Sequence, residues 1–276
     1  MAAPPIRRAF ADLSVGQVHY ASCGDAAAPA VLLLHQTPRS WREYRALLPL
    51  VGAHRRAIAM DTPGFGDSAP LAGPASIEGW AAVALELLDA LAIARCAVVG
   101  HHTGGVIAVE LAARASERVS ALVLSSTPYT DAAFRRVRAG RPPIDAVERS
   151  ADGSHLAALW QRRQPFYPGG RPDLLEAFVR DALAVAGDVE GGHRAVASYR
   201  IEERIGRIVQ PTLVIRAGDD PFAAPHAAQW LERLPDATRV DIEGGVPLPD
   251  QCPEAFARAV LDFLAARSPS GPHLPS

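Results

Sequence analysis

The chain has 276 residues, 49% of them hydrophobic, and a formal net charge of −2 at pH 7. This length and apolar content suffice for one large globular core with a modest insertion. The 28 basic residues nearly match the 30 acidic ones, and no basic run is interleaved with aromatic residues. A nucleic-acid partner is therefore not expected.

The chain lacks the sequence features of an exported or membrane-bound protein. Its cysteines, Cys23, Cys96 and Cys252, have neither zinc-site spacing nor a disulfide framework. The arginines of Met1–Arg8 are followed by no apolar signal core, and no window approaches the ~18 apolar residues of a membrane span. We therefore expect a cytoplasmic protein with reduced thiols and no membrane partner, and a homodimer is left open.

Short aliphatic runs alternate with longer helical patterns along most of the chain. Four runs predict buried parallel strands: 30–35, 56–61, 96–100 and 119–125. The pattern returns with predicted strands at 211–216 and near 238–242. Apolar residues spaced three and four apart predict helices packed on a sheet: 41–50, 77–91, 106–114, 225–234 and 253–266. This repetition indicates the α/β class, with a doubly wound, mostly parallel sheet.

One stretch, residues 130–206, breaks this rhythm with helical patterns but no convincing strand. Since it precedes the strand at 211–216, we expect a helical lid over the carboxyl ends of the strands, where open α/β sheets bind ligands. Residues 1–129 and 207–267 would then form the core. The tail, 268–276, is rich in Pro, Ser and Gly and is expected to be disordered.

The strongest local signal is a sharp turn between a strand and a helix. In residues 98–106, VVGHHTGGV, Gly100 and Gly104 flank His102. Glycines two residues before and after a central position permit a strained bend that lifts one side chain clear of the sheet. His102 is the residue lifted here.

Four landmarks, in order, resemble those of the α/β-hydrolase superfamily, and the resemblance extends from about Gln17 to Arg267. The turn at His102 is similar to that family's nucleophile elbow. The others resemble its oxyanion loop (HQTP, 35–38, with Gln36 in place of the usual Gly), its Asp-x-x-Gly-x-Gly-x-Ser turn (61–68) and the strand and loop that deliver its triad acid (211–222). The resemblance implies an α/β-hydrolase fold with an inserted helical lid.

The sequence departs from the family's catalytic triad, whose chain order is nucleophile, acid, histidine. The resemblance places the acid at Asp220, but His102 stands where the family has Ser, Asp or Cys. The family's histidine would fall seven residues before Pro253, where this chain has Val246. Since losing the nucleophile or base costs about 10⁶-fold in turnover, an ordinary serine-esterase mechanism is not expected.

A His–Asp dyad is the catalytic hypothesis that unites these departures. The elbow would aim His102 toward Asp220, which would fix the tautomer and raise the proton affinity of the ring. Imidazole, with an unperturbed pKa of ~6.5, suits general-base work on water or on a substrate hydroxyl, enol or thiol. Backbone N–H groups of Thr37 and Thr103, at the family's oxyanion positions, would stabilise an oxyanion or enolate.

Two further histidines, His35 and His193, are candidates for oxyanion or substrate binding. The competing interpretations are that His35 fixes its loop and that His193 faces solvent. The arginine pairs at 135–136 and 162–163 are interpreted as solvated faces.

The sequence thus predicts a hydrolase, or a lyase or cyclase, acting on a small apolar carbonyl compound: an ester, lactone, thioester or ketone. No cofactor is expected. A metal site made of His35, His102 and Asp220 has suitable ligand types, but no sequence spacing supports it. The alternative function is a non-catalytic small-molecule-binding protein or a decayed hydrolase, in which His102 only fills the pocket and Asp220 only supports its turn.

Overall fold

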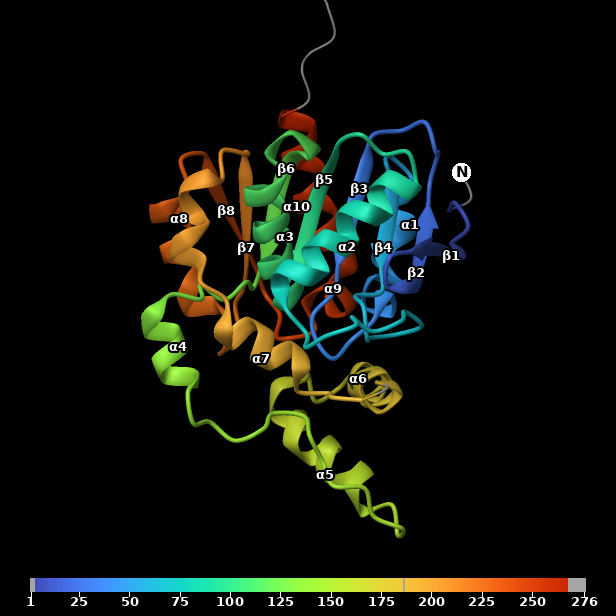
Figure 1. Ribbon diagram of the computed structural model, residues 1–276, viewed down its shortest axis with the longest axis vertical. Coiled ribbons are helices and arrows are strands. Elements are labelled where there is room, and N and C mark those ends of the chain that lie inside the picture. The colour runs from blue at the N-terminus through green and yellow to red at the C-terminus, as the bar shows by residue number, and fades with distance from the viewer. Residues whose placement is uncertain (1–2, 186, 268–276) are drawn as a thin grey trace, which may run out of the picture.

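The computed structural model describes residues 3–185 and 187–267, which build one eight-stranded sheet with helices on both faces (Figure 1). The strands are β1 Arg7–Leu13, β2 Gly16–Cys23, β3 Ala30–Leu34, β4 Arg56–Met60, β5 Cys96–His101, β6 Val119–Ser125, β7 Thr212–Ala217 and β8 Ala237–Ile242. Their order is β1-β2-β4-β3-β5-β6-β7-β8. In this order, every neighbouring pair from β4 to β8 is parallel. Strand β2 pairs antiparallel with both β1 and β4 at one edge of the sheet. The predicted doubly wound, mostly parallel sheet is confirmed.

Helices bury both faces of this sheet and create two hydrophobic cores. The helices are α1 Leu47–Gly52, α2 Ile77–Ala90, α3 Thr103–Arg114, α4 Ala132–Arg138, α5 Ser154–Arg163, α6 Pro172–Ala184, α7 Gly191–Ser198, α8 Ala227–Arg233, α9 Leu248–Gln251 and α10 Pro253–Ala266. One core joins the sheet to α2, α3 and α8, and the other joins it to α1 and α10. Strand β3 supplies Leu32 to the first core and Leu33 to the second, which explains its unbroken aliphatic run.

The sequence patterns missed the two antiparallel strands at the edge. Strand β1 is mostly exposed or half-buried, so it lacks the continuous apolar run by which the inner strands were found. The predicted helix at 41–50 is divided into a 3₁₀ turn, Trp41–Tyr44, and helix α1. Helices α4, α7 and α9, of four to eight residues each, were also not predicted.

The segment between β6 and β7 carries α4 to α7 and, among the described residues, no strand. It lies beneath the carboxyl ends of the strands in Figure 1 and has a small apolar core of its own that includes Leu159, Leu174 and Phe178. The proposed division into core and lid stays a prediction, and the tail at 268–276 lies outside the described residues. Within the described ranges, no helix combines the length and apolarity needed to span a bilayer.

Candidate active site

His102 lies at the sharp turn between β5 and α3, with φ +48° and ψ −112°. A non-glycine residue rarely adopts this conformation, so the turn stores strain that the surrounding structure must hold. The flanking glycines make it possible. A Cβ on Gly100 would lie 2.2 Å from the carbonyl oxygen of Gly104, and a Cβ on Gly104 would lie 1.9 Å from that of Leu34.

Adding a methyl group inside this turn is expected to destabilise the fold. Gly104→Ala places its Cβ against backbone, which cannot rotate away, so we expect a loss of about 1–3 kcal/mol or more in the free energy of unfolding. Gly73→Ala is the matched control, because a Cβ there meets nothing within 4 Å. Urea denaturation of both variants measures the difference. Equal stability of the two variants would show that the turn is not tightly packed.

The elbow brings His102 to Asp220, in the loop after β7. His102 Nε2 and Asp220 Oδ2 are 2.7 Å apart, with side chains 14% and 0% exposed. The N–H direction does not point straight at the oxygen, so the contact is short but is not a linear hydrogen bond. The backbone N–H groups of Phe222 and Ala223 donate to Asp220 Oδ1, at 2.9 and 3.3 Å, and fix the carboxylate.

Electrostatics favour a charged Asp220. Burial raises the pKa of this carboxyl, but the charge and contact of His102 outweigh burial and hold the pKa below its ordinary value. A carboxylate can only accept a hydrogen bond. It therefore favours the His102 tautomer with its proton on Nε2 and leaves the lone pair of Nδ1 on the other side of the ring.

The neighbouring His101 is held neutral and structural. Burial, followed by the charge of His102, lowers the pKa of His101 to about 3. Its Nε2 lies 2.8 Å from the Val246 carbonyl oxygen, and its Nδ1 lies 3.0 Å from Ser125 Oγ. Since a carbonyl only accepts, Nε2–H donates to Val246 and the Ser125 hydroxyl donates to Nδ1. The backbone of Val246 thus anchors the His101 imidazole.

The predicted oxyanion positions meet beside His102. Thr37 Oγ1 and Thr103 Oγ1 are 2.9 Å apart, and Thr103 is the first residue of α3, whose leading N–H groups have no acceptor within the helix. Helix α7 packs against Thr37 so closely that a Cβ on Gly192 would lie 2.4 Å from its side chain.

His35 is placed differently from the other candidates. It is fully buried, its Nδ1–H donates to the Gln36 carbonyl at 2.7 Å, and its Nε2 accepts the Thr62 N–H at 2.9 Å. Both ring nitrogens are therefore occupied by backbone. This geometry makes His35 a support of its loop and offers nothing to a substrate.

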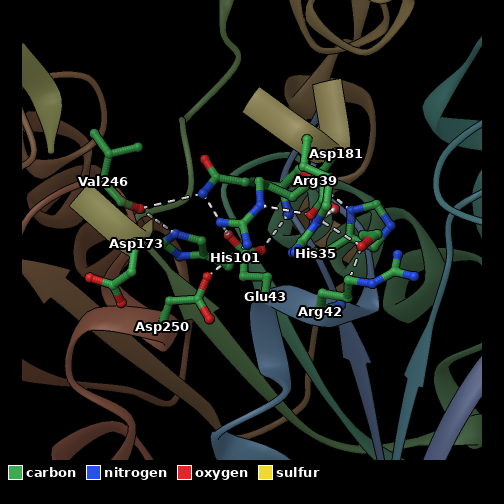
Figure 2. A network of polar contacts seen from close by, with 12 residues as sticks. His35, Arg39, Arg42, Glu43, His101, Asp173, Asp181, Val246 and Asp250 are labelled. Atoms are coloured by element: carbon green, nitrogen blue, oxygen red, sulfur yellow. Dashed lines mark hydrogen bonds and ion pairs between the residues drawn. The ribbon is translucent and has the colours of Figure 1, made fainter. Parts of the chain in front are cut away.

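A buried charge network supports the loop after β3 (Figure 2). Arg39 is fully buried, with Nε 3.0 Å from Asp181 Oδ2 of α6 and Nη2 2.7 Å from Asp250 Oδ2 of α9. Its Nη1 lies 3.9 Å from Glu43 Oε1. One guanidinium thus joins the loop after β3 to the inserted segment and to the C-terminal part of the chain.

Glu43 connects this network to the loop backbone. Its carboxylate accepts the Gln36 N–H at 2.9 Å and the Gln36 side-chain amide at 2.5 Å. Burial raises the pKa of Glu43 to about 7, although the charge of Arg39 opposes the rise. Gln36 therefore has a structural use, because it ties the loop after β3 to this carboxyl.

A cavity of about 420 Å³ opens over His102. Residues near the carboxyl ends of the strands form one wall: Gln36, Thr37, His102, Thr103, Phe222 and Val246. The inserted segment forms the other, with Phe134, Val137, Arg138, Ile144, His193 and Val196. Four of the predicted site residues therefore line one cavity: Thr37, His102, Thr103 and His193. His35 and Asp220 are not among the lining residues, and Asp220 contacts His102.

His193 belongs to a second buried cluster at this cavity. Its Nε2 lies 2.6 Å from Asp145 Oδ2, and Arg163 Nε and Nη2 donate to the same carboxylate at 2.5 and 2.6 Å. The expectation that the Arg162-Arg163 pair is a solvated face is wrong for Arg163, which is 6% exposed and lines the cavity. Asp145 had no distinguishing pattern in the sequence, because it lies in a loop 18 positions from Arg163 and 48 positions from His193.

Among the described residues, His35, His102 and Asp220, whose ligand types suit a metal but whose spacing does not indicate one, do not form a group that could hold an ion. Two other groups have three possible ligand atoms within 4.8 Å: His19, Asp61 and Asp67, and Asp145, Glu190 and His193. In the second, Asp145 is already engaged by both arms of Arg163, and Glu190 accepts the backbone N–H groups of residues 145 and 146. That cluster is satisfied by protein groups alone.

Comparisons with known proteins agree with this architecture. A sequence model of the family described as alpha/beta hydrolase fold matches residues 29–246. The magnesium-chelatase 30 kDa subunit of Rhodobacter capsulatus is 26% identical, over 94% of this chain and 96% of its own. The 2-hydroxy-6-oxo-2,4-heptadienoate hydrolase of Pseudomonas putida is 29% identical, over 87% of this chain and 90% of its own. The crystal structure of a hydrolase from Pseudomonas aeruginosa superposes with a TM-score of 0.79 at 27% identity, covering 93% of this chain and 98% of that one.

Proposed function

Because this chain belongs to the α/β-hydrolase family, we propose that it is an enzyme that cleaves a small carbonyl compound by general-base catalysis from a His–Asp pair. The observation that carries the proposal is the 2.7 Å contact of His102 Nε2 with the buried carboxylate of Asp220, at the floor of the cavity. Mostly apolar walls with a few polar groups are typical of small-molecule sites. The substrate would be an ester, lactone, thioester or ketone.

The chemistry follows from the arrangement of donors and acceptors. Nδ1 of His102 would take a proton from water as the water attacks the substrate carbonyl, and the protonated ring would be stabilised by Asp220. The N–H groups of Thr37 and Thr103 would bind the oxygen on which negative charge develops. The imidazolium would then return its proton to the leaving group. The same base could instead remove a proton from a substrate hydroxyl or enol, as elimination or cyclisation requires.

His193 is proposed as a substrate-binding residue of the same cavity. His193 lines the cavity, and the adjacent Gly192 packs against Thr37, which brings this part of helix α7 close to the loop after β3. An imidazole there can hydrogen-bond a polar group of the substrate.

A substrate panel tests the proposal. Wild type and His102→Ala are assayed on activated esters, lactones and thioesters of small acyl groups at several pH values. We expect turnover in the wild type and none above background in His102→Ala, with both proteins equally folded by circular dichroism. Turnover that persists in the variant would refute His102 as the base.

The replacement of the family's triad histidine by Val246 favours a second candidate, a binding protein that keeps the cavity without turnover. The Val246 side chain cannot accept a proton, and the neighbouring His101 has both ring nitrogens engaged, by the Val246 carbonyl and by Ser125. In that case neither protein turns over any member of the panel, yet a small apolar carbonyl compound raises the melting temperature of both.

A further inference from the structure

The inserted segment presents more positive than negative charge to the cavity. Three arginines line it, namely Arg138 at the end of α4, Arg141 in the following loop and Arg163 at the end of α5. Asp131 is the one carboxylate among the described lining residues, and its Oδ1 accepts the Phe134 N–H at the start of α4.

The three guanidinium groups differ in whether a carboxylate pairs with them. Arg163 shares two hydrogen bonds with Asp145. Within residues 3–185 and 187–267, Arg138 and Arg141 make no ion pair. Glu190 is the nearby acid, but its Oε1 is taken by two backbone N–H groups.

Arg138 is half-buried, which sets it apart from an ordinary surface arginine. Burial lowers the pKa of its guanidinium, and the charges of Arg141 and Arg163 lower it further, against the opposing effect of Glu190. Favourable interaction with the C-terminus of α4 explains cations in the last turn of this helix. It does not explain why Arg138 turns into a cavity beside two other cations, whereas Arg136 of the same turn is exposed.

We propose that the substrate carries an anionic group, a carboxylate or a phosphate, which Arg138 and Arg141 bind at the wall formed by the inserted segment. The inference rests on the proposed function in assigning the reacting carbonyl to His102. Val137 and Ile144, next to these arginines and also in the cavity lining, would contact an apolar chain that links the two ends of the substrate. Guanidinium groups suit both anions because they donate parallel hydrogen bonds to two oxygens.

Binding measurements test this inference without relying on turnover. Hexanoate, hexyl phosphate and the neutral hexanamide are titrated by calorimetry, at low ionic strength, into wild type, Arg138→Gln/Arg141→Gln and the control Arg136→Gln. Wild type and the control should bind one of the anions about ten- to a hundredfold more tightly than hexanamide, and the double variant should lose that preference. The anion preferred identifies carboxylate or phosphate.

Two results would overturn the inference: equal binding of hexanamide and both anions by wild type, or an anion preference that survives in the double variant. Failure of the proposed function has a different signature. An anion preference that depends on the arginines, in a protein that turns over no ester of the panel, including esters whose acyl chain ends in the preferred anion, refutes the proposed catalysis and retains the anion site.

Discussion

Asp220→Asn is expected to lower kcat by about 10²- to 10⁴-fold, with a smaller change in KM. Asn can keep the hydrogen bonds that Oδ1 accepts from Phe222 and Ala223, so the loop should hold its shape. Its Nδ2, however, would place a donor where Oδ2 now faces His102 Nε2. The ring would then accept at Nε2 and carry its proton on Nδ1. Nδ1, the proposed base, would lose the lone pair that proton abstraction needs.

Asp219→Asn is the matched control for this experiment. Asp219 is the adjacent residue and its side chain is exposed, so its neutralisation should leave kcat within about twofold of wild type. Steady-state kinetics on the best substrate of the panel measure both variants. A kcat for Asp220→Asn within about fivefold of wild type would contradict the dyad, because correct general-base positioning contributes far more than this.

Arg39→Met is expected to cost about 3–5 kcal/mol in the free energy of unfolding, the typical effect of removing one partner of a buried ion pair. The methionine fills much of the space but leaves Glu43, Asp181 and Asp250 facing one another in the interior. Arg171→Met is the control. Its pair with Asp173 is exposed, 47% and 58% for the two side chains, and such pairs contribute ~0–1 kcal/mol.

The loss in Arg39→Met should grow with pH. Burial already raises the pKa of Glu43 to about 7 and raises that of Asp250, in both cases against the charge of Arg39. A carboxyl whose pKa is higher in the folded than in the unfolded state gives stability that is present at low pH and lost as the pH rises through the folded pKa. Because the charge of Arg39 lowers both pKa values, removing it should raise the pKa of Glu43 and of Asp250 further. Urea denaturation should therefore show a larger difference from wild type at pH 8 than at pH 5, and a difference independent of pH would exclude the buried carboxyls as its cause.

Local patterns were enough to predict the inner part of the fold. A strand buried on both faces must be apolar throughout, and a helix packed on a sheet must show apolar residues on one side, so β3 to β7 and the long helices were visible in the chain. Strand β8 lies at the edge of the sheet and is mostly exposed, so this reason does not apply to it. The elbow was visible for a steric reason. Backbone atoms approach Gly100 and Gly104 so closely that only glycine fits, and this leaves a glycine spacing that can be read directly.

Contacts between distant segments were decided by the tertiary structure alone. Asp145 gives no signal in its own loop, yet folding brings it to His193 and Arg163 from two other helices. The Arg39 network joins residues as far apart as 211 positions, and nothing in the local sequence indicates which carboxylates a buried arginine will meet. The direction in which a side chain points could not be predicted from the sequence either. Arg136 and Arg138 are both in the last turn of α4, and only the packing of the folded chain decides that Arg138 faces the cavity and Arg136 faces solvent. Periodicity specifies which face of an element is buried, whereas a polar site depends on where several such faces meet, and that is fixed only when the whole chain has packed.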